Sequence, residues 1–313
     1  MSPIPPRTAD IVTADQVQPD SSPTRLRLVI NDAYQRLTAA GVASPRHDAE
    51  ALAAFVLGCP RGHLHVVGDM SSGQRTVFSE LVTRRAARVP LQHLTGSAPF
   101  RYLEVAVGPG VFVPRPETES VAGWCIDALL AARTDGPSIP GPLVVDLCTG
   151  SGAIALSIAH EVKGAVVHAV ERESAAYQWA MRNATGTGVE VHNADAADAL
   201  HELDGTVDLV VANPPYLPDA HRDHVDPEVR DHDPDAALWG GPDGLAGPRL
   251  IEEAARRLLR SGGLVAVEHA DDQGTAVAAL FSASGEWSHV AVRQDLVGRD
   301  RFVTACRVKE QDQ

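Results

Sequence analysis

The chain contains little cysteine, and it has no excess of basic residues. Among its 313 residues are four cysteines, and acidic residues outnumber basic ones to give a formal net charge of −14. The cysteines, at positions 59, 125, 148 and 306, are far apart and match no zinc-binding spacing, so we interpret them as free thiols in a reducing compartment. Proteins that bind duplex nucleic acid usually carry a basic face, so the negative charge argues against direct binding of DNA or RNA.

Long apolar stretches are also absent. No run reaches the length of a transmembrane helix and no signal-peptide pattern is present, so we expect a cytoplasmic protein without membrane contact. Thirteen histidines are scattered along the chain. The closest pairs, His63/His65 and His221/His224, lack the further ligands that a metal site needs, so no metal is predicted. No segment marks a subunit interface, and we expect a monomer.

The first part of the chain is predicted to be a tail followed by a small helical domain. Residues 1–24 are rich in Pro, Ser, Thr and Asp and are expected to be a disordered tail. Within residues 25–89, apolar positions at helical spacing predict helices from Leu26 to Gly41, from Pro45 to Leu57 and from Ser72 to Arg88. This domain is either a stabilising cap or a recognition domain for a macromolecular substrate.

Residues 90–120 connect the helical domain to the rest of the chain. Alternating apolar residues between 103 and 107 predict a hairpin that ends at Gly108-Pro109-Gly110. Pro114-Arg115-Pro116 is stiff and extended, and Glu117 begins a helix that continues to about Ala132. The segment is a linker, or it forms one wall of a cleft.

Residues 121–313 alternate between strands and helices. After a loop at 133–142, strands are predicted at residues 143–147, 165–170, 189–192, 207–212, 264–268, 288–293 and 301–307. Helices are predicted at residues 153–160, 174–184, 249–260 and 273–282. This order predicts an α/β fold with a parallel, doubly wound sheet and an antiparallel hairpin at one edge. Residues 217–246 are a long acidic loop, which is a solvated surface, a docking surface for a basic partner, or a lid.

The stretch Asn213-Pro214-Pro215-Tyr216 directly follows the predicted strand at 207–212. Two prolines end the strand and stiffen the backbone, so the stretch lies at the carboxyl edge of the sheet, where ligands bind in such folds. The side-chain oxygen of Asn213 and the carbonyl of Pro214 can accept the two N–H groups of an amide or an exocyclic amine. Tyr216 can pack on the planar group. The chemistry that suits this arrangement is methylation of that nitrogen, by positioning and electrostatics. A simple turn is the alternative.

A glycine turn follows the predicted strand at 143–147, and an acidic residue closes the next strand. The turn, Asp146-Leu147-Cys148-Thr149-Gly150-Ser151-Gly152, brings backbone close to a ligand, and Glu171 can accept hydrogen bonds from ribose hydroxyls. The turn differs from the NAD fingerprint and lacks the lysine of a P-loop. It suits S-adenosylmethionine better, with Asp146 near the amino group of its methionine part and Asp195 near the adenine amine.

Together these motifs resemble the protein-(glutamine N5) methyltransferases that act on peptide chain release factors (the HemK/PrmC type). The resemblance covers roughly residues 26–308. It rests on Pro90–Gly96, Phe112–Glu119, Asp146–Ala155, Asn213–Tyr216, Pro227–Val229, Ala237–Leu245 and Glu268-His269. It implies a class I S-adenosylmethionine-dependent methyltransferase with a Rossmann-like, seven-stranded, mostly parallel sheet. The implied substrate is the Gly-Gly-Gln loop of a release factor, a protein of translation termination, and the helical domain would dock the rest of that protein.

The resemblance also assigns residues by position. Asn213, Pro214, Pro215 and Tyr216 would hold the substrate glutamine, with Asn213, Pro214 and Tyr216 in the catalytic role. The implied cofactor contacts are Phe112, Asp146, Cys148, Thr149, Gly150, Ser151, Gly152, Glu171, Asp195, Ala196 and Asn213. Two positions depart from the family pattern. Cys148 stands where glycine is usual, and Ala196 stands where some relatives carry a tryptophan.

Two alternative functions remain open at this point. The Asn-Pro-Pro-Tyr motif also occurs in methyltransferases that modify adenine N6 in nucleic acid, but an acidic loop beside the site would repel phosphates. The departure at Cys148 instead suggests a non-catalytic paralogue with a weakened cofactor site. Salt-sensitive binding to DNA or RNA would indicate the first alternative, and the absence of cofactor binding would indicate the second.

Overall fold

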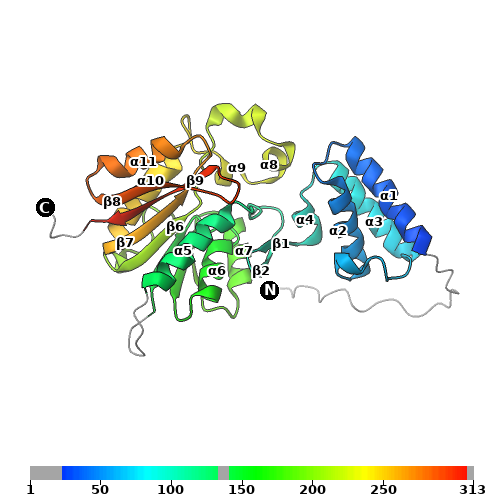
Figure 1. Cartoon of the computed structure of the whole chain (residues 1–313), viewed down its shortest axis with the longest axis horizontal. Helices are drawn as coiled ribbons and strands as arrows, with labels where there is room; N and C mark the ends of the chain where they lie inside the picture. The colour runs from blue at the N-terminus through cyan, green and yellow to red at the C-terminus, as the bar shows by residue number, and fades with distance from the viewer. Residues whose placement is uncertain (1–22, 133–140, 309–313) are drawn as a thin grey trace. The chain divides into compact units, whose positions relative to one another are not determined.

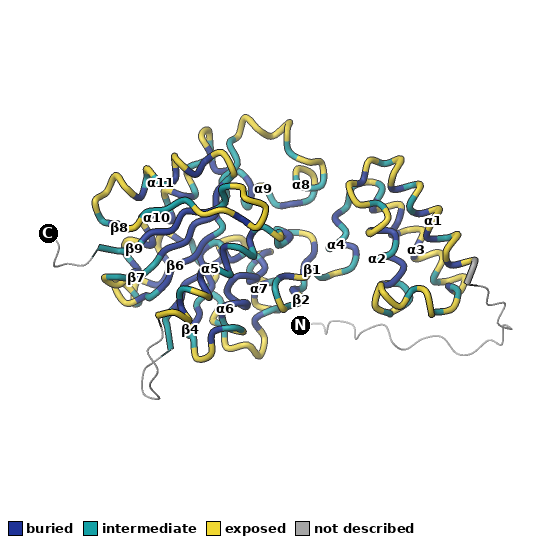
Figure 2. The backbone as a smooth tube through the Cα atoms, in the orientation of Figure 1, coloured by how far each residue is buried: buried dark blue, intermediate teal, exposed yellow. Residues whose placement is uncertain are grey.

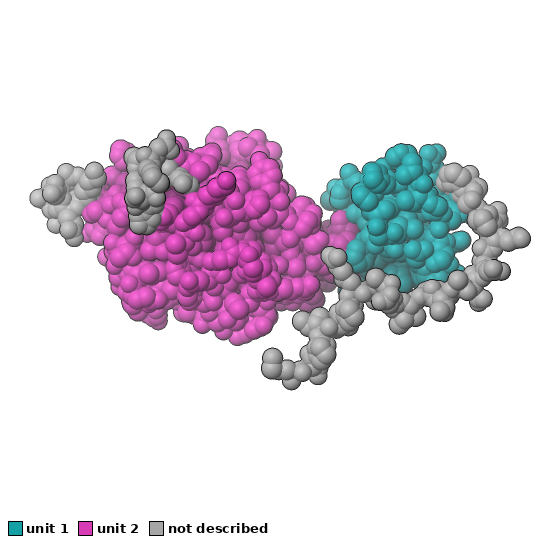
Figure 3. All heavy atoms as spheres, turned by 90° about the horizontal axis from the view of Figure 1, so that it is seen from below, with its two compact units in different colours: residues 1–87 teal, residues 88–313 magenta. Residues whose placement is uncertain are grey.

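The computed structural model describes residues 23–132 and 141–308. Residues 1–22 of the predicted tail and residues 133–140 of the predicted loop lie outside the described residues. The chain divides into two compact units, with the boundary between Ala87 and Arg88 (Figure 3). None of the helices in the described ranges is long and apolar enough to cross a membrane.

The first unit is helical, as predicted. Its elements are α1 (Pro23–Ala39), α2 (Pro45–Leu57), the short 3-10 helix η1 (Arg61–His63) and α3 (Ser72–Ala86). Gly58 ends α2 in a left-handed conformation, and Ser71 and Gln74 form a reciprocal capping box at the start of α3. Asp48 on α2 and Arg85 on α3 form a buried ion pair at 2.7 Å, so the two helices are joined inside the unit.

The second unit contains a seven-stranded sheet in the order β5-β4-β3-β6-β7-β9-β8. The strands β3 to β7 are parallel, and β9 is antiparallel to both β7 and β8. The strands are β3 (Leu143–Leu147), β4 (Val166–Glu171), β5 (Glu190–Asn193), β6 (Val207–Ala212), β7 (Leu259–Glu268), β8 (Trp287–Gln294) and β9 (Asp300–Arg307). The predicted mostly parallel sheet with an antiparallel edge is therefore confirmed.

Helices cover both faces of the sheet (Figure 1). One core packs α5 (Thr118–Ala132), α6 (Ala153–Glu161) and α7 (Ser174–Ala184) against the sheet. The other core packs α10 (Ala246–Leu258) and α11 (Gly274–Ala283) against the opposite face. The central strands are buried along most of their length (Figure 2), as expected for parallel strands covered on both sides.

A short helix and a hairpin precede the sheet. Helix α4 (Leu91–Thr95) leads into strands β1 (Ser97–Phe100) and β2 (Leu103–Ala106), which pair antiparallel as predicted. Ala98, Phe100 and Val105 belong to the core around α5 to α7. Asn183 on α7 joins the hairpin to that helix, because its side chain exchanges two hydrogen bonds with the backbone of Ala106.

Helix α4 was not predicted, and two further regions differ from the sequence-based prediction. Strand β7 begins at Leu259 rather than Leu264, and it pairs with β6 through a register shift. Glycine at 263 allows this, since a Cβ there would come within 3.0 Å of the Val207 carbonyl oxygen. The segment 217–246 is also not a plain loop. It contains η3 (Asp219–His224), α8 (Pro227–His232) and α9 (Asp235–Leu238), while η2 (His201–Leu203) lies before β6.

Candidate active site

The turn after β3 is organised by Asp146, a buried residue near the end of that strand. Its Oδ2 accepts hydrogen bonds from the Thr149 hydroxyl at 2.6 Å and from the Ala155 backbone N–H at 3.1 Å. The carboxylate therefore joins the turn to the first turn of α6. Burial raises the pKa of Asp146 to about 7.

Cys148 occupies the left-handed region of backbone space, with φ of 58°. Glycine adopts this conformation without strain, whereas a side chain there costs roughly 1–2 kcal/mol. The glycine that is usual at this position is therefore explained by the backbone. Burial raises the pKa of the Cys148 thiol to about 12, with Glu171 and Asp146 adding to the effect. The thiol therefore stays protonated and is no nucleophile at neutral pH.

Glu171 stands at the end of β4 and faces the same turn. Its Oε2 accepts a hydrogen bond from the Gly150 N–H at 2.9 Å, and its Oε1 accepts one from the Glu173 N–H at 2.8 Å. These bonds fix the carboxylate while each oxygen keeps a second lone pair. Asp195, after β5, forms an ion pair with Arg172 at 3.5 Å. The two acidic side chains thus lie at neighbouring strand ends.

Asn213 follows β6, and its side chain contacts the first residue of α5. The Asn213 Nδ2 donates to the Thr118 hydroxyl oxygen at 3.5 Å. This orientation, assigned from the hydrogen-bond geometry, leaves the amide oxygen of Asn213 available as an acceptor. Thr118 is 4% exposed, so its hydroxyl is held in place by packing.

Tyr216 contacts a second buried acid beneath the motif. Its hydroxyl donates to Glu268 Oε1 at 3.2 Å, and Glu268 lies at the end of β7 with 1% exposure. Burial raises the pKa of Glu268 to about 7, although contact with the Thr118 hydroxyl and the charge of Arg301 act in the opposite direction. Thr118 thus lies between Glu268 and Asn213. Glu268 supports the phenol of Tyr216 directly and the amide of Asn213 through Thr118.

Three glycines pack against the backbone of Asn213–Tyr216. A Cβ at Gly240 or Gly247 would overlap the carbonyl oxygen of Pro215, and one at Gly244 would overlap that of Tyr216. The Gln273 side chain also donates to the Tyr216 carbonyl at 2.9 Å. The backbone of the motif is therefore held from behind, in a shape that its own prolines already restrict.

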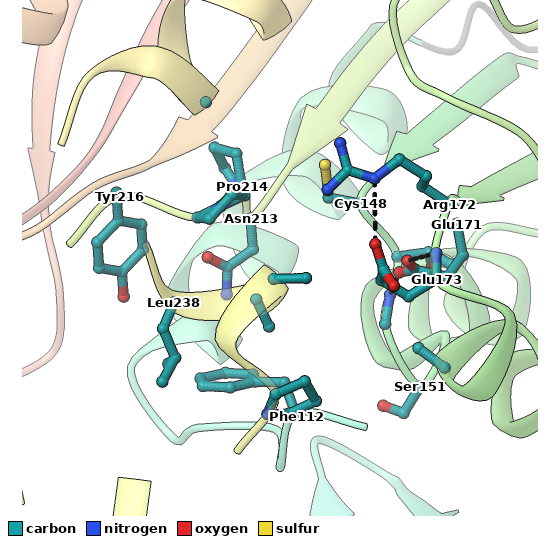
Figure 4. A pocket seen from close by; sticks show the side chains of 18 of the residues that line it. Phe112, Cys148, Ser151, Glu171, Arg172, Glu173, Asn213, Pro214, Tyr216 and Leu238 are labelled. Carbon is teal, nitrogen blue, oxygen red and sulfur yellow. Dashed lines mark hydrogen bonds and ion pairs between the residues drawn. The ribbon is translucent and has the colours of Figure 1, made fainter. Parts of the chain in front are cut away.

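Many of these groups line one cavity of about 530 Å³. Figure 4 shows Asn213, Tyr216 and Leu238 on one side of it, Cys148 and Glu171 on the other, and Phe112 below and between them. Segment 217–246 contributes a wall of mainly apolar residues: Leu217, Val225, Val229, Pro234, Ala236, Ala237, Leu238, Trp239 and Gly240. The acidic loop of the sequence-based prediction is therefore, in part, a wall of the cavity.

Ion pairs attach this wall to the Pro-Arg-Pro segment and to the start of the second unit. Arg115 contacts Asp233 at 2.6 Å, and the Asp233 side chain is 0% exposed. Arg88 contacts both Asp226 and Glu228, at 3.0 Å and 3.1 Å. These three acidic residues of the segment are thus paired with arginines that lie outside it.

Most of the predicted site residues line the cavity, and two do not. Those that line it are Phe112, Cys148, Thr149, Gly150, Ser151, Glu171, Asp195, Ala196, Asn213, Pro214, Pro215 and Tyr216. Asp146 lies behind the turn, and Gly152 begins α6 with φ of 86°, where a Cβ would press on Leu156. The prediction gave no role to Thr118, Glu268 or Trp239. All three do occur in the quoted motifs, which was the available signal.

Comparisons with known proteins agree with this arrangement. Residues 29–96 match the model of the PrmC N-terminal domain, and residues 129–227 match that of the methyltransferase small domain. The chain is 54% identical to the release factor glutamine methyltransferase of Streptomyces coelicolor over 276 residues, which cover 88% of this chain and 96% of the relative. It is 50% identical to the protein of that name from Mycolicibacterium smegmatis over 287 residues, covering 91% and 99%.

A relative with another name is also similar. The 4-amino-L-phenylalanine/4-methylamino-L-phenylalanine methyltransferase of Streptomyces pristinaespiralis is 42% identical over 289 residues, covering 92% of this chain and 96% of that one. The fold is that of the class I methyltransferases, with the seven-stranded sheet and the cavity at its carboxyl edge. By the extent and level of these similarities, the chain belongs to the release factor glutamine methyltransferase family.

Proposed function

We propose that this protein methylates the side-chain amide nitrogen of a glutamine in the Gly-Gly-Gln loop of a peptide chain release factor, using S-adenosyl-L-methionine. The observation that carries the proposal is the position of Asn213. Its amide oxygen faces a cavity that also contains the glycine turn and Glu171, while its nitrogen is engaged by Thr118. The methyl donor and the amide nitrogen that accepts the methyl group can therefore meet in one cavity.

The cavity fits the methyl donor by the chemistry of its lining. Glu171 offers an anchored carboxylate to ribose hydroxyls, and Asp195 lies at the next strand end for the adenine amine. Asp146 Oδ1 is buried and has no hydrogen-bond partner within the described ranges. A positively charged amino group at the turn would satisfy that oxygen directly or through water. When bound, S-adenosylmethionine supplies a sulfonium methyl group, which the substrate nitrogen takes directly.

The protein's own residues act on the substrate amide. The Asn213 side-chain oxygen and the Pro214 carbonyl each accept one N–H, which fixes the amide and increases electron density on its nitrogen. Tyr216 packs on the amide plane and is held by Glu268. The nitrogen loses its proton to solvent after transfer, and no covalent enzyme intermediate forms. Positioning and electrostatics supply the rate acceleration.

The helical unit has the role of a docking domain in this proposal. The described residues that line the cavity all lie between positions 100 and 250, in the second unit. A matching PrmC N-terminal domain at residues 29–96 supports a recognition role rather than a chemical one. One chain supplies the whole cavity, which supports a monomer. A release factor works at translating ribosomes, so the proposal places the reaction in the cytoplasm.

The two alternatives are weakened by specific observations. Asp219, Asp223 and Asp231 are exposed on the segment that forms a wall of the cavity, and such charge opposes the approach of a nucleic-acid backbone. A non-catalytic paralogue was suggested by Cys148. The Cys148 side chain strains the backbone at that residue alone. The turn stays open at Gly150, where a Cβ would meet no atom within 4 Å.

Transfer of labelled methyl from S-adenosylmethionine to a recombinant release factor tests the proposal. A Gly-Gly-Ala version of the release factor is the control, and free 4-amino-L-phenylalanine is a third acceptor because of the similar relative with that name. Label on the first acceptor alone supports the proposal. Label on the Gly-Gly-Ala version, or on the free amino acid alone, contradicts it.

A further inference from the structure

Three side chains with metal-binding atoms meet on β4 and β5, the two strands at one edge of the sheet, and none of them lines the cavity. His168 on β4 is the direct register partner of Glu190 on β5. His192 lies two residues after Glu190, so its side chain is on the same face of the sheet. The sequence could not indicate this group, because its members come from two strands. The paired residues His168 and Glu190 are 22 residues apart in the chain.

The spacing of the three groups matches a tetrahedral ion site. The His168 Nδ1 lies 3.1 Å from the His192 Nε2 and 3.6 Å from the Glu190 Oε2. Zinc–nitrogen bonds of about 2.0–2.1 Å place neighbouring tetrahedral ligand atoms about 3.3 Å apart. All three ligand atoms lie within 4.8 Å of one another, and no other such group occurs within residues 23–132 and 141–308.

The two imidazole rings are also held in place. The His168 side chain is 12% exposed. In the structure the two ring nitrogens share one hydrogen bond, and the rings are stacked with centroids 5.3 Å apart. Both rings are therefore already ordered beside each other.

We propose that His168, Glu190 and His192 form a binding site for a Zn²⁺ ion. Two nitrogen ligands and one carboxylate favour zinc over Mg²⁺, which prefers oxygen ligands. A water molecule completes the fourth position.

A bound ion would join β4 and β5, the two strands at one edge of the sheet. Strand β4 ends at Glu171, three residues after His168, and Asp195 follows three residues after His192. Asn193 already donates to the Glu171 carbonyl at 2.8 Å, so these strand ends are coupled. The ion therefore stabilises the edge of the sheet that carries the proposed ribose and adenine contacts, without entering the reaction.

The test is Zn²⁺ binding to the untagged full-length protein, measured by competition with a chromophoric chelator after removal of metal. Co²⁺ substitution, followed by visible absorption, reports whether the site is tetrahedral. The variants are His192→Gln and Glu190→Gln, both at partly or fully exposed positions. His221→Gln is the matched control, because His221 and His224 also form a ring pair but have no place in the three-residue group.

The expected result is one Zn²⁺ per chain, with affinity lowered at least about 100-fold in His192→Gln and unchanged in His221→Gln. Loss of an outer-shell partner alone costs roughly 10–100-fold, so loss of a ligand costs no less. Zn²⁺ should also raise the melting temperature of the wild-type protein but not that of His192→Gln. Absence of binding at millimolar Zn²⁺, or equal binding by His192→Gln in a folded state confirmed by circular dichroism, would overturn the proposal.

Discussion

The hydroxyl of Tyr216 donates a hydrogen bond to the fully enclosed carboxylate of Glu268, at 3.2 Å. The bond connects the last residue of the Asn-Pro-Pro-Tyr motif to the end of the neighbouring strand β7. Thr118 contacts the same carboxyl group and also accepts from Asn213. One buried acid therefore supports both side chains that would hold the substrate amide.

The raised pKa of Glu268 predicts a pH-dependent contribution to stability. Burial raises this pKa from 4.5 to about 7, so the folded state keeps a proton that the unfolded state loses between these values. The contribution is complete below about pH 4.5 and is lost as the pH rises through about 7. The measurement is urea unfolding of wild type and of Glu268→Gln at pH 5 to 8. The free energy of unfolding of wild type, relative to that of the variant, should fall as the pH rises.

The exposed Glu253 on α10 provides the control for that experiment. Glu253→Gln should leave the difference from wild type constant across the same pH range. A wild-type advantage over Glu268→Gln that grows toward pH 8 would show that the carboxylate is ionised and stabilised in the folded state, against this account.

Gly247 predicts a steric test of the motif's backbone. In the first turn of α10, alanine would ordinarily favour the helix by about 1 kcal/mol. A Cβ at this position would instead overlap the Pro215 carbonyl oxygen. We expect Gly247→Ala to lower both the free energy of unfolding and the rate of methyl transfer. Chemical denaturation and single-turnover assays measure the two effects.

Gly73→Ala is the matched substitution, since Gly73 is also in the first turn of a helix and a Cβ there meets no atom within 4 Å. It should be neutral or slightly stabilising, with unchanged transfer. Equal effects of the two substitutions would mean that the Pro215 contact is unimportant.

The left-handed conformation of Cys148 predicts opposite effects of two replacements. Glycine removes the strain, so Cys148→Gly should bind S-adenosylmethionine at least as tightly as wild type. Valine is branched at Cβ and tolerates positive φ poorly, so Cys148→Val should unfold more easily, by about 1–2 kcal/mol relative to Cys148→Gly. Calorimetry measures the affinity for S-adenosylmethionine, and urea unfolding measures the difference in stability. If Cys148→Val were the more stable of the two, the backbone assignment at this residue would be wrong.

The Arg115–Asp233 ion pair predicts that one arginine holds the cavity wall. Removal of Arg115 leaves a fully enclosed carboxylate without its cation, and such a loss is strongly destabilising. Arg115→Ala should speed amide hydrogen exchange in residues 225–239, measured by mass spectrometry. Arg230→Ala removes a pair with Asp231 whose side chains are 43% and 48% exposed, and it should change exchange little. Similar exchange in both variants would argue against this role for Arg115.

The sequence predicted the sheet and the cavity lining because their signals are local. Strand–helix alternation, the glycine turn and Asn213–Tyr216 are contiguous patterns, and parallel topology brings their ends to one edge. Asp146 does not line the cavity but lies behind the turn, where Oδ2 accepts from Thr149 and Ala155 and Oδ1 has no partner among the described residues. Contacts between distant segments were not predictable in the same way. Thr118 and Glu268 are far apart in the chain, and only the fold places them together.

The segment 217–246 illustrates the same limit. Its acidic composition indicated a solvated loop, a docking surface or a lid, and its apolar residues at irregular spacing gave no helical pattern. The structure shows short helices whose apolar side chains line the cavity. The strand predicted at 264–268 also began too late, because glycine weakens a strand interior, although Gly262 and Gly263 both lie within β7.

The most direct test of the account is methyl transfer by Asn213→Ala, measured together with its affinity for S-adenosylmethionine. Loss of the amide oxygen should lower single-turnover transfer to a release factor by at least about 100-fold, as loss of one such positioning group does in other enzymes. The dissociation constant for S-adenosylmethionine, from calorimetry, should change only a few-fold, because the turn and Glu171 remain. Transfer close to the wild-type rate with intact cofactor binding would contradict the central role of Asn213.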